Sequence, residues 1–170
     1  EHIDSAAFVR SENAPHSDLA VAIDAKGAED ALAVGTLRAE NASPAPLSER
    51  RLPLRELHAS VRLVGGVIDF SGIDADLGAA GAAAGDGRVE DAVLQLALAV
   101  ERLDLHALHA SLRATRLAGD VRAQISATRI ESTLALHESG RELRGRIVRE
   151  GEAVRAEDVR IAIGRGEITG

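Results

Sequence analysis

The chain has 170 residues, a formal net charge of −7 at pH 7 and a sequence pI of about 5.4. This length suffices for one domain with a real hydrophobic core, and the acidic balance gives no attraction for a polyanion, so we expect no nucleic-acid partner. Cysteine is absent, which excludes disulfides and thiolate metal sites, and no apolar run approaches the roughly 20 residues that a membrane-spanning helix needs.

Short segments in which every second residue is aliphatic follow one another along most of the chain. Such alternation puts the aliphatic side chains on one face of a strand and the remaining side chains on the other. In chain order the clearest sets are Leu19, Val21, Ile23 and Ala25; Leu57, Ala59, Val61 and Leu63; Leu94, Leu96, Leu98 and Val100; Val121, Ala123, Ile125 and Ala127; Ile130, Ser132, Leu134 and Leu136; and Val159, Ile161 and Ile163. We therefore expect an all-β protein of about ten or eleven strands, most of them antiparallel.

The phase of the alternation changes at two glycines. Leu32 and Val34 precede Gly35 in one phase, and the aliphatic residues after Gly35 follow the other phase. The same change occurs around Gly72. A glycine at such a point predicts a β-bulge, which re-aims the apolar side chains and curls the sheet.

The connections between the alternating segments are short and rich in glycine. Turn residues stand at 139–140, 150–152 and 164–166, at the spacing typical of an antiparallel meander. Three of the four prolines lie within 41–53, so this segment cannot be a central strand and we expect an irregular linker there. Because the composition is alike on both sides of the linker, we expect a single domain over 1–170.

One segment departs from the two-residue period. The leucines within 103–112 have helical spacing, and Asp104 is positioned to cap a short helix or helical turn. The strand pattern then resumes with Leu-x-Gly-x-aliphatic at 117–121, and the same pattern recurs at 143–147.

No arrangement of residues predicts an active site. Residues 81–87 are rich in glycine but lack the Lys-Ser/Thr of a phosphate loop, so we expect a flexible turn between strands.

His106 and His109 have no third ligand nearby, which favours solvent-facing histidines over a metal site. Residues 74–76 lack the glycine and glutamate of a calcium loop and are expected on the polar side of a strand. Asn41 begins a sequon that is followed by proline, a poor acceptor. We expect no enzyme, no metal and no cofactor.

Two all-β architectures fit the alternation. In a closed sandwich or small barrel the apolar faces pack against each other, and periodicity alone favours this arrangement. In an open sheet the apolar face lines a groove. Cores of this size usually contain several large rings, whereas Phe8 and Phe70 are the only aromatic residues of this chain. The shortage of rings favours the open sheet.

The order of these patterns resembles a family of bacterial envelope proteins. An alternating strand ends in Leu103-Asp104-Leu105, a leucine-spaced turn follows, and the strands resume at Leu117-Ala118-Gly119. This order is similar to TamB, the translocation and assembly module subunit, and its AsmA-like relatives. The segment 159–170, where a strand ends in Gly-x-Gly and another begins, is also similar to the repeat of that family. The resemblance covers 54–170.

The resemblance implies an elongated, curled sheet with an aliphatic concave face, placed in the periplasm of a Gram-negative bacterium. It implies a protein anchored in the inner membrane that meets the outer-membrane Omp85-type barrel TamA, and of which this chain is an excised piece. The implied function is transport of phospholipid, support of outer-membrane protein assembly, or both, without catalytic residues. The side chains expected to face phospholipid acyl chains in the groove are Val21, Ile23, Val61, Leu63, Leu94, Leu96, Leu98, Val100, Val121, Ile125, Leu134, Leu136, Val159, Ile161 and Ile163.

Two other functions fit the same alternation. In one, open strand edges pair with nascent outer-membrane proteins such as autotransporters during their insertion with TamA, and main-chain hydrogen bonds provide the affinity. In the other, a closed β-sandwich acts as a structural module.

Overall fold

The computed structural model describes residues 2–3, 16–151, 153–163 and 166–170. Within these residues the chain forms one antiparallel sheet of twelve strands paired in chain order, so the expected all-β class is confirmed. None of the described helices is long and apolar enough to cross a membrane. The strands are β1 (His2–Ile3), β2 (Leu19–Ala28), β3 (Ala31–Asn41), β4 (Glu56–Val64), β5 (Val67–Asp76), β6 (Ala82–Glu90), β7 (Val93–Leu103), β8 (Leu117–Ile125), β9 (Arg129–Glu138), β10 (Arg141–Glu150), β11 (Ala153–Ile163) and β12 (Gly166–Thr169). Helix α1 (Leu105–Leu108) and the 3-10 turns η2 (Leu47–Glu49) and η3 (Gly78–Ala80) lie in connections.

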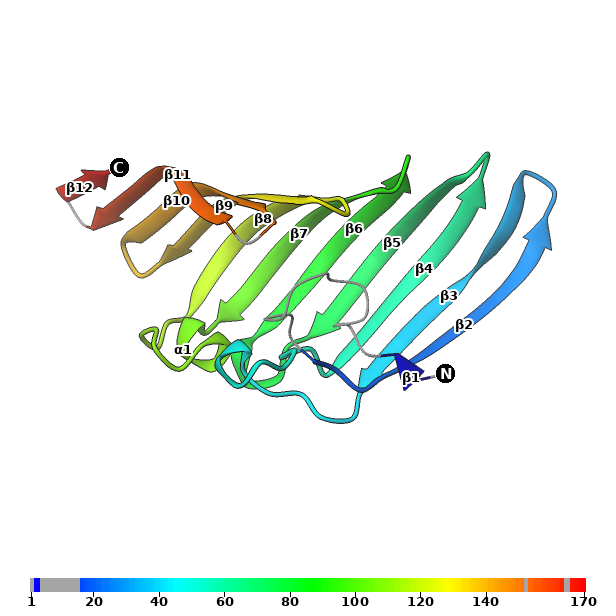
Figure 1. Cartoon of the computed structure of the whole chain (residues 1–170), viewed down its shortest axis with the longest axis horizontal. Coiled ribbons are helices and arrows are strands. Elements are labelled where there is room, and N and C mark those ends of the chain that lie inside the picture. Colours follow the sequence, from blue (N-terminus) through cyan, green and yellow to red (C-terminus); the bar gives the residue numbers. More distant parts are fainter. Residues whose placement is uncertain (1, 4–15, 152, 164–165) are drawn as a thin grey trace.

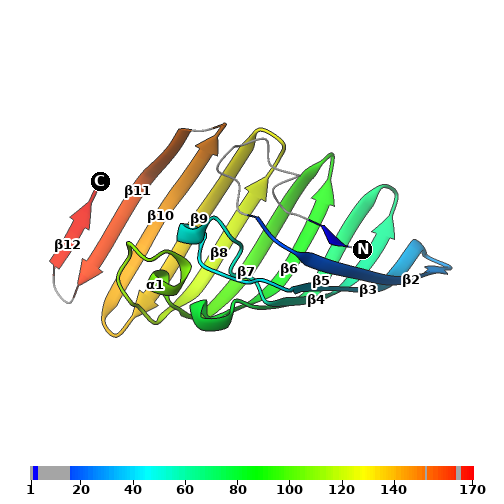
Figure 2. The same ribbon diagram turned by 60° about the horizontal axis from the view of Figure 1, so that its bottom comes forward.

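The sheet is open and curled. Strands β2 and β12 lie toward opposite ends of the molecule (Figure 1). In Figure 2, β2 and β3 pass in front of the strands at the middle of the sheet, and α1 lies on the same front side. The sheet therefore has a concave side that holds α1. The described residues form no second sheet, which excludes the closed sandwich.

Strand register assigns each side chain to one of two faces. In β7, Leu96 and Leu98 alternate with Ala97, and Leu98 pairs with Gly85 of β6 and Val121 of β8. Cross-strand partners share a face because alternate residues of a strand point to opposite sides. Apolar residues thus meet apolar residues across the sheet. We call this side of the sheet the apolar face and the opposite side the polar face.

The bulge expected at Gly72 is confirmed. Gly72 has a φ of 60°, and the register of β5 shifts there against both neighbouring strands. The shift lies between His58 and Ser60 of β4 and between Phe70 and Ile73 on the β6 side. The extra residue keeps Phe70 and Ile73 on the apolar face although an odd number of positions separates them.

The prediction of a β-bulge at Gly35 is wrong. Gly35 pairs with Val61 of β4 in an uninterrupted register, and β3 also keeps its register with β2 at this point. Glycine is required there by a close approach of strands, because a Cβ added to Gly35 would lie 2.1 Å from the carbonyl oxygen of Asp24. Leu32 and Val34 consequently point to the polar face, where Leu32 is 73% exposed.

The glycine-rich segment 81–87 forms a strand and not the expected turn. Only Gly81 lies in a connection, while β6 is paired on both sides, with β5 and β7. A Cβ added to Gly85 would lie 2.0 Å from the carbonyl oxygen of Ala97 in β7. Glycine has a low propensity for strands, so the sequence of this segment does not predict one. The strand forms because its main chain pairs with both neighbouring strands.

The buried core lies where α1 covers the sheet. Its buried residues are Ala75, Ala83, Val100, Leu103, Leu117 and Leu136. Leu105 and Leu108 of α1 pack against this cluster. The Asp104 carboxylate caps α1 by accepting a hydrogen bond from the His106 amide at 3.0 Å, which confirms the expected helical turn and its N-cap. Since α1 lies on the concave side, the apolar face is the concave face.

The proline-containing segment between β3 and β4 is tied to the sheet by Asn41. This side chain is only 7% exposed. Its Oδ1 accepts hydrogen bonds from the amides of Asp18 and Ser43, and its Nδ2 donates to the carbonyl oxygen of Leu52. The Asn41 amide is therefore engaged within the fold and is not free for modification.

The hairpin expected at 139–140 is present. Ser139 and Gly140 both have positive φ, 37° and 78°, as a tight two-residue turn between twisted strands requires. Gly151 lies in the turn between β10 and β11. Residues 152, 164 and 165 of the other two expected turns lie outside the described residues, as does Phe8.

Candidate functional site

The apolar face crosses the sheet as rows of cross-strand partners. One row extends from β2 to β12 without a polar residue and consists of Val21, Ala39, Leu57, Ala75, Ala83, Val100, Gly119, Leu136, Leu143, Ile161 and Ile168. With about 4.8 Å between neighbouring strands, such a row is roughly 50 Å long. The structure thus brings residues from the whole described chain onto one continuous aliphatic surface.

Every groove residue expected from the alternation lies on this face. Val159, which follows a register shift in β11, is placed there by its contact with Gly145, whose added Cβ would lie 3.5 Å from the Val159 Cγ2. Further members that the alternation analysis left out are Leu37, Ile68, Phe70, Ile73, Val89, Leu143 and Ile147. The bulge at Gly72 explains why Ile68, Phe70 and Ile73 all lie on this face.

Two of the expected groove residues are not available to a ligand. Val100 is 6% exposed and Leu136 is 2% exposed, because both belong to the cluster beneath α1. Their partners are side chains of the same protein. The expectation that they face acyl chains is therefore wrong, and the open part of the face begins beyond them along the strands.

The rest of the apolar face is only partly covered. Leu94, Leu96 and Leu98 are half-buried, although a closed core would cover them fully. Exposure increases toward the two ends of the sheet, where Ile23 is 64% exposed and Ile163 is 54% exposed. An open aliphatic surface of this extent is unusual for a monomer and indicates a binding surface.

The floor of the groove is lowest along β6. This strand presents only Ala83, Gly85 and Gly87 in the rows nearest α1, and the side chains of its neighbours lean over them. A Cβ added to Gly87 would lie 2.9 Å from the Leu96 Cδ2 and 3.4 Å from the Ile73 Cδ1. Leucine and isoleucine methyl groups from both sides thus converge above a floor without side chains.

The two long rims of the groove differ. One rim carries α1, η3 and the segment 42–55, which are joined by a hydrogen bond from the Asp104 amide to the Ala80 carbonyl oxygen at 3.0 Å. The Ala110 amide also donates to the Ser48 Oγ at 3.3 Å. The opposite rim consists of tight turns such as 64–67 and 90–93. Among the described residues, helix and linker segments thus lie along one rim, and tight turns form the other.

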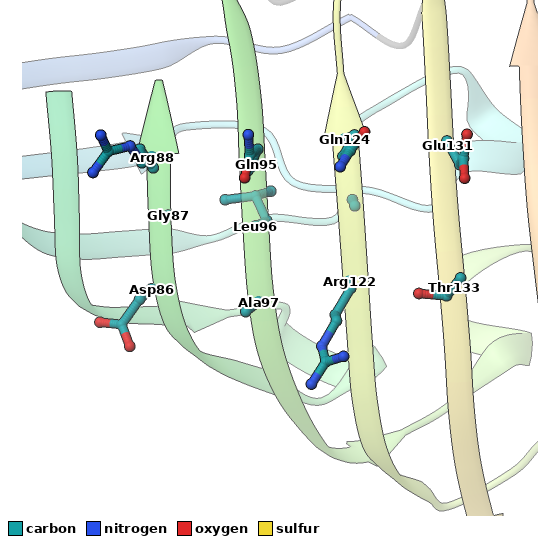
Figure 3. Close-up of a pocket in the computed structure, with 11 residues that line it drawn as sticks. Asp86, Gly87, Arg88, Gln95, Leu96, Ala97, Arg122, Gln124, Glu131 and Thr133 are labelled. Atoms are coloured by element: carbon teal, nitrogen blue, oxygen red, sulfur yellow. The ribbon is translucent and has the colours of Figure 1, made fainter. Parts of the chain in front are cut away.

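The polar face carries a shallow depression of about 500 Å³ over β6 to β9 (Figure 3). Arg88, Gln95, Gln124 and Glu131 form one row across it, and Asp86, Ala97, Arg122 and Thr133 form the next. No pair of a nucleophile and a base is found among these side chains. The described residues also contain no group of three or more His, Asp or Glu side chains that could hold a metal ion.

Most charges of the polar face are paired across neighbouring strands. Arg88 contacts Glu90 and Asp69, each at 3.2 Å, and these carboxylates raise the pKa of the Arg88 guanidinium, with Glu90 the larger cause. Arg146 and Arg129 hydrogen-bond to Glu131 and lower the pKa of its carboxyl group, with Arg146 the larger cause. Such pairing stabilises a water-exposed sheet surface but performs no chemistry.

The remaining motifs have structural partners. The ring Nδ1 of His106 lies 2.9 Å from the Leu112 carbonyl oxygen, and that of His109 lies 2.8 Å from the Ser111 Oγ. Asp74 and Asp76 have His58 and Glu56 as register partners on the polar face, as expected, whereas Ala75 between them lies on the apolar face.

Comparison of the chain with protein-family models, with curated proteins and with solved structures found no match. The fold and the site by themselves define the class: an open antiparallel meander whose concave face is a continuous aliphatic groove.

Proposed function

We propose that this chain is a segment of a TamB-like periplasmic bridge, whose apolar groove shields phospholipid acyl chains between the inner and outer membranes. The observation that carries the proposal is the half-buried aliphatic surface beside the α1 cluster, with Leu98, Val121 and Leu134 as cross-strand partners, on a curled sheet that has no second layer within the described residues. The membrane anchor and the contact with an outer-membrane Omp85-type barrel belong to other parts of such a protein.

The proposed binding of acyl chains depends on the apolar surface area that is removed from water. An acyl chain makes no hydrogen bonds, and it is retained by roughly 0.8 kcal/mol for each methylene group removed from water. A wall of Leu, Val, Ile, Ala and Gly supplies this contact without directional groups that would stop a chain from sliding. The groove needs no catalytic side chain, and we propose that the protein is not an enzyme.

The test places charge on the groove. In the double variant L96R/L98R two half-buried side chains of the apolar face become cationic, and lipid recovered with the purified protein should fall at least about tenfold. The matched control A97R/A99R puts the same two charges on the polar face of the same strand, so it separates loss of the groove from a general effect of added surface charge. Native mass spectrometry and lipid extraction give the readout. Unchanged lipid recovery in a folded L96R/L98R variant would contradict the proposal.

A second candidate function is pairing of the sheet edges with client strands. Among the described residues, β1 covers only Leu19 and Ala20 of β2, and the segment 166–170 pairs with residues 159–163 of β11. The rest of both edges has no strand partner within the described part of the chain, and an extended outer-membrane protein segment can use such main-chain groups for strand addition.

Proline at one edge position separates this function from lipid binding. Because the Asn41 amide donates to Arg55, the main-chain groups of Asn41 and its partner Leu19 point away from the β2–β3 ladder. Residues of β2 in the same phase, including Ala25, therefore direct their amides to the open edge. The A25P variant should lose binding of a client peptide while its lipid recovery stays unchanged, whereas retained peptide binding would exclude pairing at this edge.

A further inference from the structure

An arginine lies on the apolar face at the rim of tight turns. β10 alternates through Gly145, Ile147 and Arg149 on this face. Arg149 pairs with Ile130 of β9 and with Val154 of β11, so its cross-strand partners on both sides are aliphatic. A guanidinium at such a position is an exception on a face that is mainly aliphatic.

The described acids closest in sequence and register to Arg149 are Glu131 and Glu150, and both form ion pairs on the opposite face. Glu131 contacts Arg146 at 2.8 Å and Arg129 at 3.0 Å, and Glu150 contacts Arg155 at 2.8 Å. Glu150 also pairs with Arg129.

Arg149 itself has no ion pair with any described residue. Its Nε donates to the Gly151 carbonyl oxygen at 2.9 Å, which holds the side chain toward the rim. The two terminal nitrogens of the guanidinium have no acceptor among the described residues. The other arginine of this face in β10, Arg141, lies at the far end of the strand, where its cross-strand register partner is Glu138.

A hydroxyl lies on the same face one step deeper in the groove. Ser132 of β9 pairs with Ile147 and is therefore a diagonal neighbour of Arg149, at about 7–8 Å. Ser132 is half-buried, and the next residues along its strand on this face are Ile130 and Leu134. A cation at the rim and a hydroxyl below it thus adjoin aliphatic surface on all sides.

We propose that Arg149, assisted by Ser132, binds the anionic head group of an amphiphile whose acyl chain lies in the apolar groove. This inference rests on the proposed function and names the chemical class of its ligand. A guanidinium binds a carboxylate or a phosphate through two parallel hydrogen bonds, and its position at the rim keeps the charged head group in water while the chain enters the groove. The ligand class is an acyl chain with an anionic oxygen head group, either a carboxylate or a phosphate.

The experiment compares three amphiphiles that share one saturated chain: the fatty acid, the monoacyl phosphate and the fatty alcohol. Because the chain contains no Trp or Tyr, displacement of an uncharged fluorescent acyl probe reports binding without background from the protein. Wild type should bind both anionic amphiphiles more tightly than the alcohol. R149Q should weaken binding of the anions about tenfold and leave the alcohol unchanged, while S132A should weaken the anions about twofold. The anion that loses more affinity in R149Q identifies carboxylate or phosphate as the preferred head group.

The matched control is R122Q. Arg122 lies on the polar face of β8 and likewise has no ion pair with a described residue, so its loss changes the net charge equally without touching the groove. Equal effects of R122Q and R149Q, or equal losses for anion and alcohol in R149Q, overturn the head-group site while leaving the groove intact. Failure of wild type to bind any of the three amphiphiles overturns both proposals. Circular dichroism and the unfolding temperature verify that each variant keeps its sheet.

Discussion

The Asn41 Nδ2 donates a hydrogen bond to the Leu52 carbonyl oxygen at 3.1 Å, and it does so from a side chain that is almost fully buried. This bond, together with the two that the Asn41 Oδ1 accepts, holds the proline-containing segment against the sheet. The Asn41 side chain thus contributes three of the hydrogen bonds that hold this rim of the groove.

Replacing Asn41 with leucine should lower the free energy of unfolding by about 2–4 kcal/mol, because a buried carbonyl and two amides lose their partner. Thermal and urea unfolding provide the measurement. S43A is the control, since Ser43 contributes only its main-chain amide to this arrangement. An N41L variant as stable as wild type would contradict the role of Asn41 as the attachment point of the rim.

Gly85→Ala should destabilise the protein by about 2–3 kcal/mol, because its Cβ would meet the Ala97 carbonyl oxygen at 2.0 Å and force β6 away from β7. G27A provides the comparison, since a Cβ there has no neighbour closer than 3.9 Å. We expect G27A to change the stability by less than about 1 kcal/mol. Equal effects of the two substitutions would show that β6 does not lie as tightly against β7 as the structure has it.

Val148 and Ile147 are adjacent in β10 but point to opposite faces, and we expect opposite sensitivities to truncation. Val148 is 2% exposed on the polar face, with Glu131 and Arg155 as its cross-strand partners, whereas Ile147 is 39% exposed in the groove. V148A should cost about 1.5–3 kcal/mol and I147A less than about 1 kcal/mol in urea unfolding. A larger loss for I147A would mean that the groove is packed against other side chains and is not open.

The cap of α1 should respond to pH. Backbone hydrogen bonds from Thr115 and His106 to the Asp104 carboxylate lower its pKa, with Thr115 the larger cause. A group whose pKa is lower in the folded state stabilises the fold above its unfolded value, about 4, and loses this contribution as the pH falls through the folded value. The difference in unfolding temperature between wild type and D104N should therefore be largest near pH 7 and disappear toward pH 2. A difference that is constant from pH 7 to pH 2 would exclude the charged cap.

Local pattern was sufficient where one strand or turn carries its own signal. The leucines of β7, the tight turn at 139–140 and the cap at Asp104 were each predictable, because the period of a strand, the φ values of a turn and the capping hydrogen bond depend on neighbours in sequence. Local pattern failed at Gly35 and in β6. At both places glycine is required by a strand that lies next to it in space, and no residue nearby in sequence reports that contact.

The sequence by itself determined that the chain is a succession of antiparallel strands with one aliphatic side, and that α1 interrupts them after β7. Only the tertiary structure decided which aliphatic residues remain open. Val100 and Leu136 became core because the curl of the sheet and the fold of α1 bring Leu105 and Leu108 over them, while Leu96 and Leu98 stayed accessible. Burial is a property of what lies opposite a side chain, and alternation specifies only the side to which it points.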